Sequence, residues 1–116
     1  MVWLDEALAG DRYPVDVDEQ RRLAAHEIAT GWRSETGHGV AVHGSPSWIE
    51  RLGDIEVPTL VVHGTADPVF PIDHGRQLAS RIAGAVLVEV DGLGHDAPAP
   101  LWDDLRDVIG EHLIRG

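Results

Sequence analysis

Two titratable side chains lie where α/β proteins often place their chemistry, each in a turn that follows a short apolar run. Asp67 follows the run Thr59–Val62, after a break at Gly64. His95 follows the run Ala85–Val90, in a turn rich in glycine. An unbroken apolar run of this length is typical of a strand covered on both faces, as in a parallel sheet. Open α/β sheets carry their catalytic residues at the carboxyl ends of such strands.

The order and spacing of these residues predict a contact between them. Neighbouring strands lie about 5 Å apart, so the turns that follow them lie side by side. A carboxylate in one turn can accept the Nδ1–H of an imidazole in the other, which fixes the tautomer of the ring and raises its basicity. We therefore expect Asp67 and His95 to lie within hydrogen-bonding distance, or one water apart, as the acid and base of a nucleophilic triad.

The elements that must position this pair follow from periodicity and from helix-ending residues. Helices are expected over Val2–Ala9, from Asp16 or Asp18 to about Arg33, over Trp48–Leu52, from Pro71 or Asp73 to Ile82, and over Leu101–Leu113. From Ile55 onward the order is strand, helix, strand, helix, which predicts one βαβ unit and a covering helix. Residues 1–54 show helix and loop patterns without strand signals. We expect two segments, 1–54 and 55–116.

Composition excludes several classes of function. The net charge is −11, all nine basic residues are arginines, and no basic stripe stands out, so nucleic acid is not expected as a partner. No apolar run reaches about 18 residues and the N-terminus lacks a basic region, so neither a membrane span nor a signal peptide is expected. Cysteine is absent, which excludes disulfides and thiolate sites and fits a cytoplasmic protein. No cofactor is expected.

Several short motifs of residues 55–115 together resemble the C-terminal part of an α/β-hydrolase of the aclacinomycin methylesterase-like esterase branch. The motifs are Pro58-Thr59-Leu60-Val61-Val62-His63-Gly64, Asp67-Pro68, Pro71, His74-Gly75, Leu78-Ala79 and Gly92-x-Gly94-His95-Asp96. The chain order, Asp before His, is also that of this family. The resemblance implies an α/β fold with a short parallel sheet, Asp67 as the triad acid and His95 as the general base. It further implies that residues 1–54 are the late, helical part of a cap over the site and that the substrate is a carboxylic ester.

The sequence departs from the family at the nucleophile. The motif Gly-x-Ser-x-Gly is absent, and no serine of the chain has that context: Ser34, Ser45, Ser47 and Ser80. One hypothesis is an ester hydrolase whose nucleophile comes from another chain or from a missing upstream part, so that this chain alone is inactive. The alternative is a non-catalytic, truncated hydrolase that serves as an interaction or small-ligand-binding domain. Missing strands would leave an open sheet edge, so a homo-oligomer is also expected.

Simpler interpretations of the same residues stay open at this point. Asp67, which precedes Pro68, is typical of an Asx-turn, and His95 is equally compatible with an ordinary loop histidine. The remaining histidines, including His63, are interpreted as structural or solvated. A metal site formed by His63, Asp67 and His95 is the least favoured alternative, although these donor types suit zinc.

Overall fold

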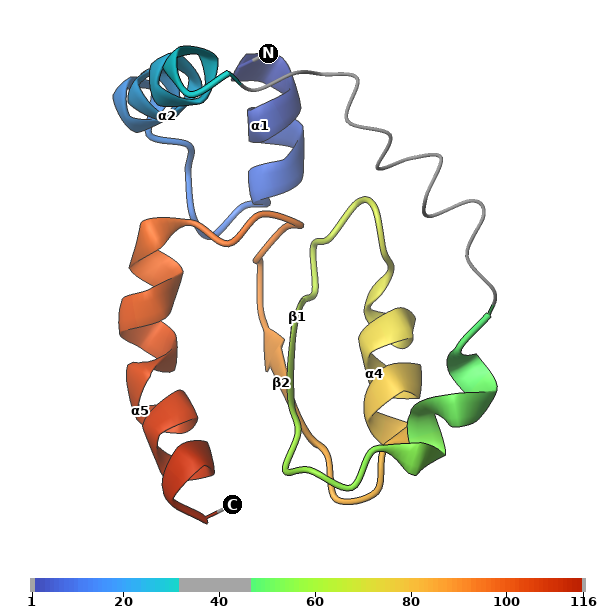
Figure 1. The fold of residues 1–116 in the computed structure, drawn as a ribbon. Helices are drawn as coiled ribbons and strands as arrows, with labels where there is room; N and C mark the ends of the chain where they lie inside the picture. The colour runs from blue at the N-terminus through green and yellow to red at the C-terminus, as the bar shows by residue number, and fades with distance from the viewer. Residues whose placement is uncertain (1, 32–46, 116) are drawn as a thin grey trace. The chain divides into compact units, whose positions relative to one another are not determined.

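The computed structural model describes residues 2–31 and 47–115, and every structural statement below concerns these residues (Figure 1). In chain order the elements are α1 (Val2–Ala9), α2 (Val17–Ala29), the 3₁₀-helix η1 (Ile49–Asp54), β1 (Leu60–Gly64), α4 (Ile72–Arg81), β2 (Val86–Val90) and α5 (Ala99–Arg115). No helix of this described part is both long enough and apolar enough to cross a membrane. Contacts divide the chain into two compact units: Met1–Val15 with Arg51–Gly116, and Asp16–Glu50.

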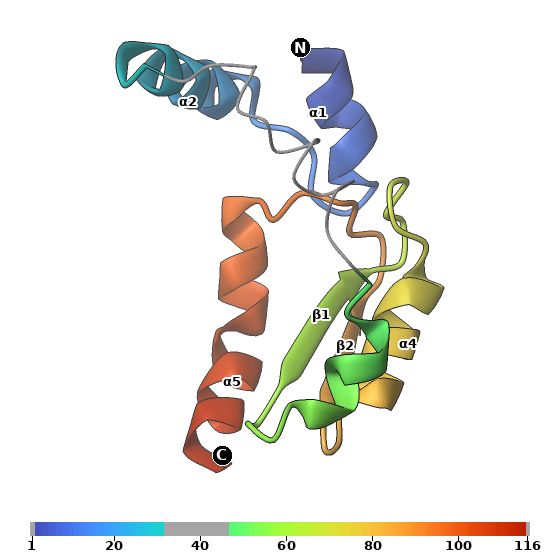
Figure 2. The same ribbon diagram turned by 45° about the vertical axis from the view of Figure 1, so that its right-hand side comes forward.

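A parallel pair of strands lies at the centre of the first unit. Leu60 of β1 is paired with Val86 of β2, and the register runs on to Gly64 and Val90. Helix α4 covers one face of this sheet and α5 covers the other (Figures 1 and 2). Within the described residues β1 has β2 as its neighbour on one edge and no strand on the other. The predicted strand–helix–strand–helix order, and with it the α/β class, is confirmed.

The core on the α5 side of the sheet follows from two periodicities. Leu101 and Leu105 are buried one helical turn apart, and Ile109 packs against the same cluster one turn later. Val62, Val88 and Val90 contribute to this cluster from the sheet. Tyr13, after α1, and Leu93, in the turn after β2, complete it. The 3.6-residue spacing of Leu105, Val108, Ile109 and Leu113 predicts that Leu113 also lies on this face, which is wrong. That side chain is 75% exposed, because the helix extends past the end of the short strands.

The opposite face of the sheet is fixed by a glycine and by an ion pair. Gly75 of α4 lies against His63 of β1 so closely that an added Cβ would come within 2.8 Å of the imidazole Nδ1. Arg76, the next residue of α4, donates to both carboxylate oxygens of Glu89 on β2, at 2.6 and 2.9 Å. Such a two-point pair also fixes orientation. Helix α4 therefore sits on the strand that leads into the Asp67 turn.

The second unit contains α2, whose two ends are set by side chains. Asp16 is the N-cap and accepts two backbone N–H groups of the first turn, each at 3.0 Å. The helix ends at Ala29, earlier than predicted, because the Thr30 hydroxyl donates to two carbonyls of the last turn and Gly31 turns to a φ of 85°. Trp32 and Arg33, the last residues of the predicted helix, lie outside the described residues.

The structure places the first helix with the sheet. Residues 1–15 belong to the same compact unit as residues 51–116, and Gly10 forms an isolated antiparallel bridge with Leu93 in the turn before His95. The expected division into a cap-like segment, 1–54, and a hydrolase-like segment, 55–116, stays a prediction. The contacts of residues 1–15 are therefore with the unit that carries Asp67 and His95.

Candidate active site

The turns after β1 and β2 bring the two predicted residues together. The Nδ1 atom of His95 lies 3.0 Å from Oδ2 of Asp67, although the residues are 28 positions apart. The Asp67 side chain is only 6% exposed, whereas that of His95 is 36% exposed. The expected contact is therefore confirmed. The carboxylate lies inside the turn, and the imidazole can be reached from outside.

The second carboxylate oxygen of Asp67 shapes the turn. Oδ1 accepts the backbone N–H groups of Val69, at 2.8 Å, and of Phe70, at 2.9 Å. This is the Asx-type turn that the sequence also allowed before Pro68. Asp67 therefore forms the Asx-turn and contacts His95 at the same time, because each carboxylate oxygen makes one of the two sets of contacts. Three donors fix the plane of the carboxylate, so its orientation toward His95 is set before any substrate arrives.

Hydrogen bonding also sets the charge of Asp67. Burial of the carboxyl opposes its ionisation, but the hydrogen bonds from His95, Phe70 and Val69 outweigh burial and lower the pKa of Asp67 below its ordinary value. An ionised carboxylate only accepts hydrogen bonds, so the Nδ1–H of His95 is the donor. In the neutral ring Nε2 is then unprotonated. The arrangement thus presents a ring nitrogen that is ready to take a proton.

Backbone contacts between the two turns explain how they stay together. Thr65 donates its N–H to the Val90 carbonyl at 3.0 Å, and Ala66 donates to the Leu93 carbonyl at 3.0 Å. The Thr65 hydroxyl accepts the Gly92 N–H at 2.9 Å. At Gly64 an added Cβ would overlap the Leu93 carbonyl, so only glycine allows this approach. The distance between Asp67 and His95 is therefore set by these contacts between the two turns.

His63 is the residue of the site that the sequence analysis did not assign. Its Nε2–H donates to the Phe70 carbonyl at 2.8 Å, and the same nitrogen lies 3.6 Å from Oδ2 of Asp67, too far for a hydrogen bond. Its side chain is 14% exposed. Its position at the very end of an apolar strand was the available signal. No group of metal-binding side chains is found among the described residues, His63, Asp67 and His95 included.

A hollow of about 520 Å³ lies over this pair. Its lining joins His63, Asp67 and His95 to apolar side chains of α5, including Leu105 and Trp102. The Phe70 ring, whose centroid is 5.5 Å from that of His95, also borders it. The hollow continues along β1, whose residues Leu60, Val62 and Gly64 complete the lining. The imidazole therefore faces an apolar space next to the open edge of the sheet.

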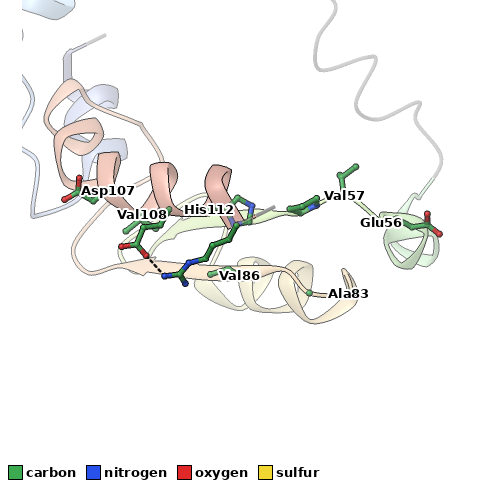
Figure 3. A pocket seen from close by; sticks show the side chains of 11 residues that line it. Glu56, Val57, Ala83, Val86, Asp107, Val108 and His112 are labelled. Atoms are coloured by element: carbon green, nitrogen blue, oxygen red, sulfur yellow. Dashed lines mark hydrogen bonds and ion pairs between the residues drawn. The ribbon is translucent and has the colours of Figure 1, made fainter.

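A second hollow of similar size lies at the other end of the strands, as Figure 3 shows. It is lined by residues that precede β1 and β2, such as Val57 and Ala83, and by the last turns of α5. The ion pair between Arg115 and Glu111, 3.1 Å apart, lies at this hollow. The Nε2 atom of His112 is buried there without a hydrogen-bond partner. None of these residues contacts Asp67 or His95, so this hollow is not the site of the pair.

No described serine completes a triad. Between residues 47 and 115 the serines are Ser47 and Ser80, and the Ser80 hydroxyl donates to the Gln77 carbonyl in its own helix. Ser34 and Ser45 lie outside the described residues. The described part of the chain thus holds an imidazole oriented by a carboxylate, without a serine on a sharp strand-to-helix turn.

Two solved structures that resemble this chain are hydrolases. A serine hydrolase involved in carbazole degradation, the CarC enzyme, superposes with a TM-score of 0.67 and 25% identity over 99% of this chain and 46% of that one. An esterase from Exiguobacterium antarcticum superposes with a TM-score of 0.63 at 23% identity, over 97% of this chain and 40% of that one. The short parallel sheet with its covering helices is therefore a partial α/β-hydrolase fold.

Relatives with assigned activities agree with this fold. Rhodomycin D methylesterase of Streptomyces peucetius is 33% identical over 109 residues, which cover 90% of this chain and 36% of that protein. Pimeloyl-[acyl-carrier protein] methyl ester esterase of Aromatoleum aromaticum is 30% identical over 82 residues, or 69% of this chain and 32% of that protein. The chain thus spans about a third of the length of these curated relatives. The family described as TAP-like protein matches residues 30–101. By this match the chain belongs to the TAP-like family of α/β-hydrolases, with similarity to esterases.

Proposed function

We propose that this chain supplies the base and the acid of a carboxylic-ester hydrolase. In this proposal His95 is the general base, Asp67 orients it, and the nucleophilic serine lies outside the 116 residues, in an upstream segment or on another chain. The observation that carries the proposal is the 3.0 Å contact between a buried, ionised carboxylate and the Nδ1–H of an accessible imidazole. That contact leaves Nε2 as the reactive atom.

The substrate class is proposed from the relatives. Two of them are named for the hydrolysis of methyl esters, one on rhodomycin D and one on a pimeloyl group carried by a protein. We therefore propose a methyl ester of a carboxylic acid as the substrate. The apolar lining of the hollow beside His95, which includes Phe70 and Trp102, fits an ester with an apolar acyl part.

In the proposed reaction each proton transfer involves His95. Nε2 of His95 takes the proton of the serine hydroxyl as the oxygen attacks the ester carbonyl carbon. The imidazolium that results donates through Nδ1–H to Asp67, whose negative charge stabilises it. Nε2 then gives the proton to the departing alkoxide, and methanol leaves. Nε2 then takes a proton from water as the water oxygen attacks the acyl-enzyme carbonyl carbon, and it returns this proton to the departing serine oxygen as the carboxylic acid is released.

A chimeric enzyme tests this proposal. The part of the Streptomyces peucetius rhodomycin D methylesterase that aligns with this chain is replaced by the chain, so that the relative supplies serine and oxyanion hole. We expect the chimera to react with a fluorophosphonate probe and to hydrolyse methyl esters. The change His95→Ala should abolish both activities, whereas His26→Ala, a change of an exposed histidine on α2, should leave both intact.

The same probe applied to the 116-residue chain alone provides the complementary measurement. Without a serine held against Nε2, we expect no stoichiometric adduct by intact-mass measurement. A folded chimera that stays active after His95→Ala would show that His95 is not the base. An adduct on a serine of the isolated chain, lost in His95→Ala, would show that the nucleophile lies within these residues.

A further inference from the structure

The turn that carries His95 is held by the end of helix α1 as well as by the sheet. The Leu8 carbonyl accepts the backbone N–H groups of His95, at 2.6 Å, and of Asp96, at 3.2 Å. The Ala9 carbonyl accepts the N–H of Gly94 at 2.9 Å. Carbonyls in the last turn of a helix have no partner within the helix, so they are free to accept these donors. The backbone of the proposed base is thereby fixed on a second side.

The chain after α1 continues this contact. Gly10 has a φ of 75° and pairs with Leu93 in an antiparallel bridge, and Arg12 donates its N–H to the Gly92 carbonyl at 2.9 Å. An added Cβ on Gly10 would overlap the Gly92 carbonyl, and one on Gly94 would overlap the Leu8 carbonyl. Residues 8–13, here called the strap, therefore lie backbone against backbone along the His95 turn.

Side chains at the end of the strap anchor it to helix α5. Tyr13 is 6% exposed, and its hydroxyl donates to Oδ2 of Asp104 at 2.5 Å. The Arg12 guanidinium donates to the same oxygen at 2.9 Å and lies over the Tyr13 ring, 5.3 Å from its centroid. The hydrogen bond to Asp104, together with burial, raises the pKa of Tyr13, so the phenol stays a donor.

We infer that the strap positions His95 and that Tyr13, through Asp104, is a positioning residue for the base. Asp67 fixes the plane and tautomer of the imidazole, and the strap fixes the main chain from which the ring projects. Neither Tyr13 nor Asp104 contacts His95, so their effect passes through the bonds from Leu8. An effect of the strap on ester hydrolysis rests on the proposed function, but its restraint of the His95 backbone does not.

Amide hydrogen exchange of the whole chain, followed by NMR, tests the restraint directly. The changes are Tyr13→Phe, which removes one hydroxyl, and Asp104→Asn. A matched control is Asp103→Asn, because Asp103 is the adjacent residue of α5 and forms only an exposed pair with Arg106. A hydrogen bond to a half-exposed carboxylate is worth about one factor of ten in an opening equilibrium. We expect about tenfold faster exchange of the Gly94, His95 and Asp96 amides in both variants, with β2 amides unchanged.

A second readout separates positioning from general stability. In ¹⁵N spectra, both variants should lower the fraction of His95 that carries its proton on Nδ1, and Asp103→Asn should not. Unchanged exchange at residues 94–96, or an equal acceleration in β2, would overturn the inference. In the chimera Tyr13→Phe should lower kcat and leave KM unchanged. If the variants show the faster exchange at residues 94–96 but the chimera with the wild-type chain is inactive, the inference about the strap is supported and the proposed function is contradicted.

Discussion

Replacement of Asp67 by asparagine isolates the charge of the acid from its shape. The variant Asp67→Asn keeps the size and shape of the side chain, and the amide oxygen can still accept the N–H groups of Val69 and Phe70. The amide NH₂ must then face the imidazole where Oδ2 now lies. Because NH₂ only donates, the neutral His95 ring can bond to it only through an unprotonated Nδ1. The proton then resides on Nε2, the atom that should take the proton from serine.

The expected loss of activity follows from the broken contact. A hydrogen bond to a charged group is worth about 1.5–3 kcal/mol. Its loss should lower the population of the Nδ1–H tautomer of His95 about 10- to 100-fold. The imidazolium formed during the reaction also loses a carboxylate 3.0 Å away, which is 6% exposed and therefore weakly screened. Substitution of this type in serine proteases lowers kcat about 10⁴-fold, or about 5.4 kcal/mol. We expect a loss of this order for Asp67→Asn in the chimera.

Two assays check this expectation. Methyl-ester hydrolysis by the chimera gives kcat, and ¹⁵N spectra of the chain alone give the tautomer of His95. Asp73→Asn is the matched control, since Asp73 is 71% exposed on α4 and pairs only with Arg76, three positions later. Retention of the Nδ1–H tautomer in Asp67→Asn, together with kcat within about tenfold of the parent, would refute the reasoning.

Two further predictions concern stability and assembly. Since the folded state lowers the pKa of Asp67, ionised Asp67 stabilises the fold above its unfolded pKa, near 3.9, and this contribution is lost as pH falls through the lower folded value. In urea unfolding, the stability difference between the parent and Asp67→Asn should therefore shrink below about pH 3.9; a difference that grows there would contradict this sign. The open edge of β1, beside the apolar residues Leu60 and Val62, should pair with the same edge of a second copy. Light scattering should then show dimers that form with rising concentration, and a monomer at every concentration would rule this out.

Local patterns were sufficient to predict the elements around the pair. The apolar run before Gly64 and the run before the His95 turn gave β1 and β2 to within one or two residues, because dense apolar runs are covered on both faces of a sheet. The contact of Asp67 with His95 followed from placing two parallel strands side by side. The strands were predictable because they depend on local sequence, and the contact was predictable because it depends on the pairing of two parallel strands.

The parts that the sequence did not predict depend on particular contacts. The end of α2 was placed too late because Thr30 competes for carbonyls of the last turn, which a periodic pattern does not register. The sequence did not distinguish His63 from the other histidines, because its hydrogen bond to the Phe70 carbonyl depends on the conformation of the Asp67 turn. The bonds from Leu8 to the His95 turn join backbone atoms 87 and 88 positions apart, and such bonds do not depend on residue type, so the sequence gives no signal for them.

The hydrogen bonds between the two turns bear on how such a pair passes from one gene to another. The bonds of Thr65 and Ala66, the tight approach at Gly64, and both members of the pair all fall in one continuous stretch from Leu60 to His95. Recombination that exchanges this stretch between homologous genes therefore transfers the proposed acid and base together with the contacts that set their separation. Segments outside this stretch, which form pockets and caps, can then differ between homologues while the contact between Asp67 and His95 is kept, and residues 8–13 are the part that a recipient must supply to hold the His95 turn.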